Sequence, residues 1–259
     1  MRLDIYLADN ALVDSRTDAK NFILAGAVTV NGKVVKKPSY EINGGEDITV
    51  DKSGKRFVSR GGLKLEGALD SFCIDVSGAM AIDVGASSGG FTDCLLKKGA
   101  SHVIAVDSGS GQMVESLRND PRVTVIENFN ARYMSKTDFE YSPDLAVMDV
   151  SFISAKLIIP AVANVIKPNG RFICLIKPQF EVGRGGLNKK GIVKKDSLRR
   201  TAVNDVVDFA TYCGFELMGL IESPIVGGDG NVEYLAHFVK KNCVKPQIDD
   251  KFIKRVTSL

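Results

Sequence analysis

The chain has 259 residues, enough for one large domain or two unequal ones, and its 44% hydrophobic and 25% charged residues are typical of a folded protein rather than a disordered one. Its net charge of +3 is too small for a global basic field to identify a nucleic-acid partner. Five scattered cysteines without a CxxC pair, and two histidines within apolar runs, argue against a disulfide framework and predict no metal site.

The N-terminal part of the chain has the pattern of a small α+β module. Apolar residues at helical spacing predict a helix over residues 2–10 and a second one after the cap residues 14–18. Asn31-Gly32 separates two alternating β-branched runs, which is a strong hairpin signal, and residues 47–50 add a third strand. We see no signal peptide and no apolar run as long as a membrane span, so we expect a cytoplasmic protein without membrane contact.

This order of elements, in the sequence from RLDIYLADN to EDITV, resembles the S4 domain, a small RNA-binding module of a ribosomal protein and of several RNA-modifying enzymes. The resemblance implies that RNA contacts come from the second helix and the turn after it. In this chain that face would carry six basic residues, Arg2, Arg16, Lys20, Lys33, Lys36 and Lys37. By charge alone a solvated surface is the simpler interpretation, and the whole pattern favours RNA.

A basic stretch without acidic residues follows, and its glycines indicate a linker. Its basic residues are Lys52, Lys55, Arg56, Arg60 and Lys64, of which Arg60 is a further candidate RNA contact. We therefore predict an RNA-binding domain over residues 1–58, a linker over 59–63 and a second domain over 64–240. Residues 241–259 match no pattern, and we assign them no role.

Strands and helices alternate from Met80 onward, which predicts a largely parallel, doubly wound α/β sheet with right-handed crossovers. The predicted strands are 80–84, 102–106, 122–126, 144–148, 171–176, 215–221 and 232–239. The predicted helices are 91–98, 112–118, 155–166 and 196–212. Residues 222–231 leave no room for a helix, so the last two strands should be antiparallel, unlike those of an ordinary dinucleotide fold.

The segment 80–93, MAIDVGASSGGFTD, combines a buried strand, a turn of small residues and a helix start. Ligands of open α/β sheets bind at such turns, where missing side chains allow close approach, although a plain tight turn is the alternative. The segment lacks the dinucleotide pattern GxGxxG and resembles motif I of S-adenosylmethionine-dependent methyltransferases. The resemblance implies S-adenosylmethionine as the cofactor, with contacts from Asp83, Gly85, Ala86, Ser87, Gly89, Gly90 and Phe91.

Residues after two further predicted strands are candidate cofactor contacts. Asp107 follows the glycine turn by about twenty residues, where a carboxylate accepts hydrogen bonds from ribose hydroxyls. The alternative for Asp107 is a cap of the next turn. Asn128 and Phe129 follow the third strand and are candidate neighbours of the adenine.

Four charged residues lie at element ends where few are expected: Lys64, Asp149, Lys177 and Glu233. In this order they resemble the tetrad of FtsJ-like ribose 2′-O-methyltransferases, over about residues 59–240. Together with the S4-like module, the whole chain resembles the TlyA family, also called hemolysin A. The resemblance implies a Rossmann-like class I methyltransferase domain that methylates cytidines in ribosomal RNA or ribosomal subunits. No obligate protein partner is evident from the sequence.

The tetrad has a chemical rationale, since a ribose hydroxyl is a poor nucleophile and must lose a proton during attack. A neutral lysine can take this proton if burial and a nearby cation lower its pKa from about 10.4. We therefore predict that Lys177 is the base and that Asp149 positions it beside the methyl group while also contacting the cofactor. Lys64 and Glu233 then tune the base and hold the nucleotide.

A second basic segment follows Lys177, and its glycines predict a flexible loop. The candidate RNA contacts in it are Arg184, Lys189, Lys190, Lys194 and Lys195. The alternative for this segment is an exposed loop with no ligand.

Three other functions compete with methyl transfer. One is an S4-containing RNA-binding or ribosome-assembly factor that keeps the fold as a scaffold. Another is a membrane-active haemolysin, which no long amphipathic helix or apolar span of the sequence supports. The third is an NAD-dependent enzyme, against which the missing GxGxxG weighs.

Overall fold

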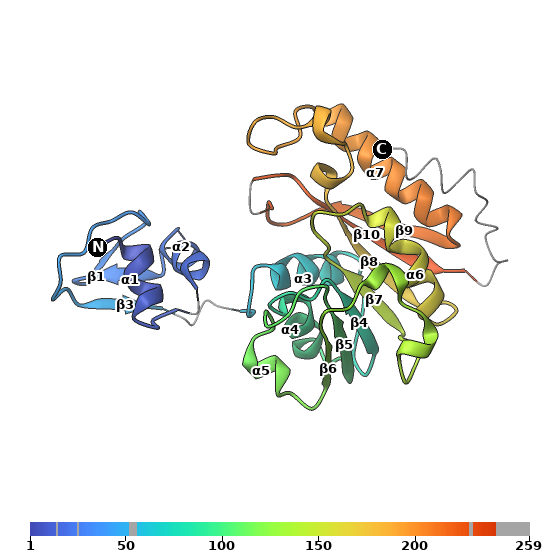
Figure 1. Ribbon diagram of the computed structural model, residues 1–259, viewed down its shortest axis with the longest axis horizontal. Helices are drawn as coiled ribbons and strands as arrows, with labels where there is room; N and C mark the ends of the chain where they lie inside the picture. The colour runs from blue at the N-terminus through green and yellow to red at the C-terminus, as the bar shows by residue number, and fades with distance from the viewer. Residues whose placement is uncertain (14, 25, 52–55, 228–229, 242–259) are drawn as a thin grey trace. The chain divides into compact units, whose positions relative to one another are not determined.

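The structure is a computed structural model that describes residues 1–13, 15–24, 26–51, 56–227 and 230–241. The chain divides into two compact units, with the boundary in the sequence between Arg56 and Phe57 (Figure 1). The predictions that rest on Lys52, Lys55 and the segment after residue 241 lie outside the described residues.

The N-terminal unit confirms the predicted helices and hairpin. Its elements are α1 (Leu3–Asp9), α2 (Arg16–Leu24), β1 (Val28–Val30), β2 (Lys33–Val34) and β3 (Ile48–Val50). Asn31 and Gly32 have φ angles of 50° and 73°, as a two-residue hairpin turn requires. The strands form an antiparallel sheet in the order β2-β1-β3, and apolar side chains from both helices pack against it.

The second unit contains a seven-stranded sheet among its described residues, in the order β6-β5-β4-β7-β8-β10-β9. The strands are β4 (Met80–Val84), β5 (His102–Val106), β6 (Val123–Ile126), β7 (Leu145–Met148), β8 (Arg171–Ile176), β9 (Phe215–Glu222) and β10 (Tyr234–Lys240). β4 to β8 are parallel, and β10 runs antiparallel to both β8 and β9. This confirms the predicted α/β class and the antiparallel final pair.

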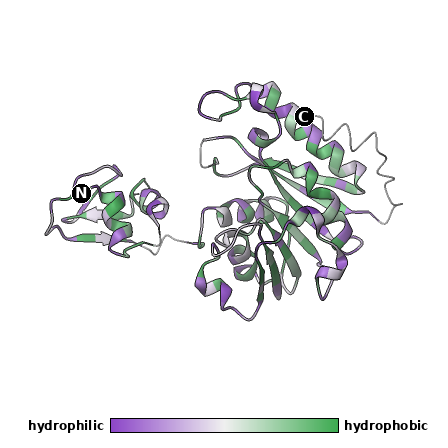
Figure 2. Ribbon diagram, in the orientation of Figure 1, coloured by the Kyte–Doolittle hydropathy of each residue, from purple (hydrophilic) through white to green (hydrophobic). Residues whose placement is uncertain are grey.

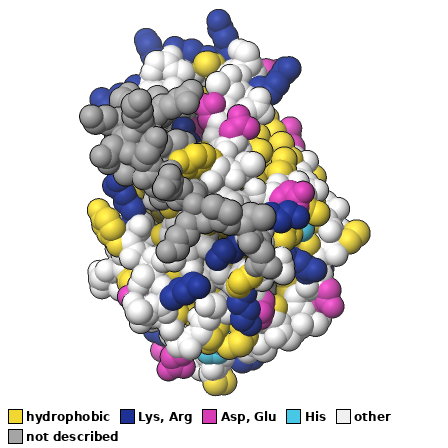
Figure 3. Space-filling model, turned by 90° about the vertical axis from the view of Figure 1, so that its right-hand side faces the viewer, with side chains coloured by type: hydrophobic (Ala, Val, Ile, Leu, Met, Phe, Trp, Pro, Cys, Tyr) yellow, Lys and Arg dark blue, Asp and Glu magenta, His cyan; other side chains and the backbone are white. Residues whose placement is uncertain are grey.

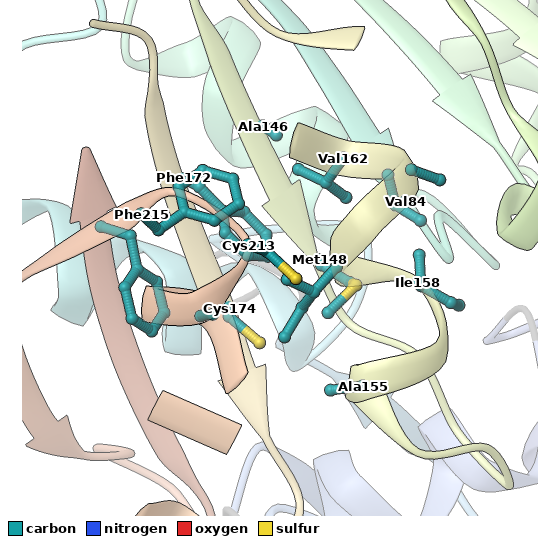
Figure 4. Close-up of a cluster of buried hydrophobic side chains, with 14 of the residues drawn as sticks. Val84, Ala146, Met148, Ala155, Ile158, Val162, Phe172, Cys174, Cys213 and Phe215 are labelled. Carbon is teal, nitrogen blue, oxygen red and sulfur yellow. The ribbon is translucent and has the colours of Figure 1, made fainter. Parts of the chain in front are cut away.

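Helices cover both faces of this sheet, because side chains alternate along buried parallel strands. The helices are α3 (Gly61–Ser71), α4 (Gly90–Lys97), α5 (Glu115–Arg118), α6 (Ile159–Val165) and α7 (Asp196–Tyr212). α6 and α7 bury one face, where Met148, Phe172 and Cys174 pack (Figure 4), and α3, α4 and α5 bury the other. The strands are accordingly hydrophobic along most of their length (Figure 2).

Short 3-10 turns account for the largest differences from the predicted helices. They are η1 (Ala131–Tyr133), η2 (Lys136–Asp138), η3 (Ala155–Leu157), η4 (Pro178–Phe180) and η5 (Arg184–Gly186). The predicted helix 155–166 is split into η3 and α6, because Pro160 has no N–H and favours a helix start. The predicted helix 112–118 forms only from Glu115. α3 starts at Gly61, so Lys64 lies inside that helix and not at the end of an element, as the sequence predicts.

In the part of the chain that the structure describes, we find no helix of the length and hydrophobicity that crossing a membrane requires. Figure 3 shows one face of the molecule, with lysine and arginine side chains gathered at its upper end. The segment that leads into α7 lies at this end in Figure 1.

Candidate active site

The turn between β4 and α4 lies against the segment that follows β7. Gly85 has a φ of +84°, and a side chain there would place its Cβ 2.6 Å from the carbonyl oxygen of Asp149. Gly89, the N-cap of α4, has a φ of +94° and would meet Leu117 and Met113. Both glycines are therefore required by backbone conformation and by close packing.

A cavity of about 670 Å³ opens where β4, β5, β6 and β7 end. Among the predicted cofactor contacts, Gly85, Ser87, Asp107, Asn128 and Asp149 line it. Phe129, a predicted neighbour of the adenine, also lines it, as do Gln112, Ser151 and Phe152, which were not predicted. This is the edge at which ligands bind in open α/β sheets.

Asp107 both caps a turn and faces this cavity. Its carboxylate accepts hydrogen bonds from the backbone N–H of Ser87 at 2.8 Å and of Gly109 at 2.7 Å. Each oxygen has a second lone pair, so the carboxylate retains acceptor capacity toward a hydroxyl in the cavity. The two roles considered for Asp107 from the sequence are therefore compatible.

The other predicted cofactor contacts do not line the cavity. They are Asp83, Ala86, Gly89, Gly90 and Phe91, and all five are largely buried. Asp83 is fully buried and accepts a hydrogen bond of 2.7 Å from the Thr92 hydroxyl, which ties β4 to α4. Burial raises the pKa of Asp83 to about 7, against which the Thr92 hydrogen bond acts. Asp83 therefore stabilises the turn between β4 and α4 from the interior of the unit.

Lys177 and Asp149 meet because β7 and β8 are neighbouring parallel strands with the same end at the cavity. The Nζ of Lys177 lies 2.6 Å from Oδ1 of Asp149 and 2.7 Å from Oγ of Ser151. The lysine side chain is only 10% exposed. The sequence predicted each residue at a strand end, and Ser151 is an addition from the structure.

Lys64 and Glu233 form a second, buried ion pair. The Nζ of Lys64 lies 2.5 Å from Oε2 of Glu233, although the two residues are 169 positions apart. The other oxygen of Glu233 accepts a hydrogen bond of 3.0 Å from Nε2 of Gln179. Gln179 belongs to η4, directly after Lys177, so one short segment contacts both ion pairs of the predicted tetrad.

Phe152 is the most unusual residue of the site. Its side chain is 91% exposed although it lines the cavity, and its φ is +63°, a region that bulky side chains rarely adopt. Its ring centroid lies 5.1 Å from that of Phe180 in η4. Strained backbone of this kind clusters at functional sites, so Phe152 is a candidate site residue that the sequence analysis missed.

Two of the predicted RNA contacts in the N-terminal unit also have a structural partner. Arg2 and Arg16 each place a guanidinium nitrogen about 3 Å from the carboxylate of Asp4, which is fully buried. Burial raises the pKa of Asp4, but the hydrogen bonds from the two arginines outweigh it and hold the pKa below its ordinary value. The remaining candidates of this unit, Lys20, Lys33, Lys36 and Lys37, are exposed.

The basic loop before α7 is held by hydrogen bonds to a buried side chain. Asn231 is buried, accepts a hydrogen bond from the N–H of Val193 at 3.1 Å and donates one to the carbonyl of Gly191 at 3.0 Å. The side chain of Asn188 caps the turn that this residue begins, because its Oδ1 accepts hydrogen bonds from the N–H groups of Lys190 and Ile192. The predicted contacts Arg184, Lys189, Lys190, Lys194 and Lys195 are exposed on this loop, and Arg60 is exposed at the start of α3, where it donates to the Val226 carbonyl.

Comparison with known proteins identifies both parts of the chain. The family described as FtsJ-like methyltransferase matches residues 57–240, and the S4 domain matches residues 1–48. Hemolysin A of Brachyspira hyodysenteriae is 45% identical over 240 residues, covering 92% of this chain and 100% of that protein. The 16S/23S rRNA (cytidine-2'-O)-methyltransferase TlyA of Mycobacterium tuberculosis is 42% identical over 234 residues, with coverages of 90% and 87%. A solved structure from Streptococcus thermophilus has a TM-score of 0.76 and 40% identity, covering 100% of this chain and 98% of that one.

Proposed function

The chain belongs to the FtsJ-like methyltransferases, with an S4 domain in front, and we propose that it transfers the methyl group of S-adenosylmethionine to the ribose 2′-hydroxyl of cytidine in ribosomal RNA. The name of the Mycobacterium tuberculosis relative describes this reaction. The observation that carries the proposal is the position of Lys177, which is held by Asp149 and Ser151 beside the cavity.

The residues around the cavity fit S-adenosylmethionine. A turn without side-chain bulk at Gly85 admits the methionine part, and Asp107 retains acceptor capacity for the ribose hydroxyls. Asn128 and Phe129 offer a polar and an aromatic side chain for the adenine. The bound cofactor supplies an electrophilic methyl group on a sulfonium cation.

We assign the proton transfer to Lys177. Its Nζ lies against Oδ1 of Asp149 and Oγ of Ser151, and as a neutral amine it would accept the proton of the 2′-hydroxyl when the hydroxyl attacks the methyl group. Asp149 and Ser151 fix the direction of the amine. Lys64 and Glu233, connected to this segment through Gln179, hold the target nucleotide in line with the methyl group.

Phe152 offers an aromatic face for the base of that nucleotide. Its ring is exposed at the rim of the cavity, close to the segment that carries Lys177. Stacking of a base on an aromatic side chain contributes about 1–3 kcal/mol and is available to every base. We therefore propose that Phe152 holds the target base while Lys177 acts on its ribose.

The direct test is methyl transfer from labelled S-adenosylmethionine to isolated ribosomal subunits, followed by alkaline hydrolysis of the RNA. A 2′-O-methyl group blocks cleavage at its own linkage, so the expected label appears in an alkali-resistant dinucleotide. Label in mononucleotides would mean methylation of a base. Cofactor binding without any label would instead favour an RNA-binding scaffold. Leakage of liposomes by the pure protein would support the activity that the name of the Brachyspira hyodysenteriae relative suggests.

Neutral replacement of Lys189 and Lys190 by Gln is expected to weaken RNA binding at every sequence tested. Both side chains are exposed on the folded loop, so their loss removes phosphate contacts without disturbing the buried anchor at Asn231. Each lost phosphate contact should reduce the magnitude of the slope of log association constant against log salt concentration by about 0.7–0.9. The measurement is RNA affinity over a salt series.

The matched control for this double replacement is Lys167→Gln with Arg171→Gln. These two basic residues lie at the opposite end of β8, where they line a separate cavity with Asp144. Their replacement should leave the salt slope unchanged. An equal loss of slope in both double variants would mean that general charge, and not this loop, determines RNA affinity.

A further inference from the structure

Glu181 is a buried carboxylate that has no place in the reaction described above. It follows η4 and does not line the cavity. One of its oxygens accepts a hydrogen bond of 2.6 Å from the Ser154 hydroxyl, and the other accepts one of 2.8 Å from the backbone N–H of Ala155. Both partners lie shortly after Phe152 in the sequence.

The segments after β7 and β8 are joined at three successive points. Lys177 contacts Asp149 and Ser151 at the first point. The rings of Phe180 and Phe152 meet at the second. Glu181 binds Ser154 and Ala155 at the third. In the sequence, Phe152 thus lies between two residues, Ser151 and Ser154, that are hydrogen-bonded to the segment after β8.

This arrangement bears on the backbone of Phe152. A phenylalanine with a φ of +63° persists only where the surrounding structure imposes that conformation. The Phe152 side chain is 91% exposed, so its own packing cannot impose it. The hydrogen bonds on either side of Phe152 can impose this conformation, because Lys177 fixes Ser151 and Glu181 fixes Ser154.

We propose that Glu181 is a positioning residue that holds the loop carrying Phe152, so that the exposed ring is presented to the target nucleotide at the mouth of the cavity. This inference rests on the proposed function, because it assumes that an RNA base stacks on Phe152. It makes Glu181 a determinant of how RNA is engaged, without a contact between Glu181 and either substrate.

The first experiment compares Glu181→Leu with wild type. The leucine fills the buried site but has no hydrogen-bond acceptor, so both connections are lost. We expect kcat/KM for RNA to fall by about a hundredfold, the loss that a misplacement of about 1 Å near a reacting group can cause, while the affinity for S-adenosylmethionine stays within about twofold. Ser154→Ala removes only the hydrogen bond from the hydroxyl and should give a smaller effect of the same kind.

Glu66→Leu is the matched control, because Glu66 is also a buried glutamate of this unit but lies on α3 beside Lys98. It should lower the melting temperature without changing kcat/KM for RNA. Activity of Glu181→Leu within about twofold of an active wild type would overturn the inference. An inactive wild type would instead refute the proposed function, so the two failures are distinguishable.

A double-mutant cycle tests the link to Phe152 itself. If Glu181 acts through that ring, Phe152→Leu alone should lower kcat/KM for RNA about as much as Glu181→Leu does, and the double variant should lose little more. Fully additive losses would overturn the inference. The chain contains no tryptophan, so Phe152→Trp introduces a single reporter, whose emission should shift when Glu181→Leu is added and should not shift with Glu66→Leu.

Discussion

Replacement of Lys177 by Ala is expected to reduce methyl transfer by about 10²–10⁴-fold while cofactor binding persists. The range is that of a lost general base, and Lys177 is the basic group that lies between Asp149 and Ser151 at the cavity. The measurement is the initial rate of label incorporation into alkali-resistant dinucleotides, with the affinity for S-adenosylmethionine determined separately by calorimetry.

Lys177→Arg separates proton transfer from charge. An arginine keeps a cation opposite Asp149 but stays protonated, so it cannot accept a proton. If Lys177 is the base, both variants should be equally inactive. If Lys177 only supplies a positive charge, the arginine variant should recover a substantial part of the rate. Near-native turnover of Lys177→Ala, with an unchanged melting curve, would rule out both roles.

Sequence reasoning located the ends of the strands well, because apolar runs in a buried parallel sheet end abruptly at polar residues. Asp107, Asp149 and Lys177 each directly follow a strand in the structure. What the sequence could not show is which strand ends are neighbours. Lys64 and Glu233 meet across 169 positions only because α3 lies beside the antiparallel β10, an arrangement that local patterns do not encode.

The residues that the sequence analysis missed have in common that their chemistry depends on tertiary surroundings. Phe152 is an ordinary aromatic residue in the sequence, and its positive φ and exposure exist only in the folded loop. Glu181 lies next to a basic segment, and its position in the sequence suggests a solvated charge. In the structure it is buried and accepts hydrogen bonds from Ser154 and Ala155. Asp83 is the opposite case. The sequence predicts that this acid at a strand end contacts the cofactor, but in the structure its carboxylate is buried and accepts a hydrogen bond from Thr92.

Gly85→Ala is expected to abolish measurable cofactor binding and to lower the free energy of unfolding by about 2–5 kcal/mol. Two effects add: a left-handed φ of +84°, which costs a residue with a Cβ about 1–2 kcal/mol, and steric overlap, which typically costs about 1–3 kcal/mol. The new Cβ would lie 2.6 Å from the carbonyl oxygen of Asp149, and backbone cannot move aside as a flexible side chain does. The segment that carries Asp149 must therefore shift, and with it the partner of Lys177.

Gly78→Ala measures the cost of the left-handed backbone conformation without the steric overlap. Gly78 has a similar φ of +71°, but no atom lies within 4 Å of the position that a Cβ would take. It should therefore lose only about 1–2 kcal/mol and keep full cofactor binding and activity. Chemical denaturation and calorimetric titration with S-adenosylmethionine measure both quantities. If the two variants lose the same stability and both bind the cofactor, the contact between the glycine turn and Asp149 does not shape the cavity, and the close packing at Gly85 is a feature of the turn alone.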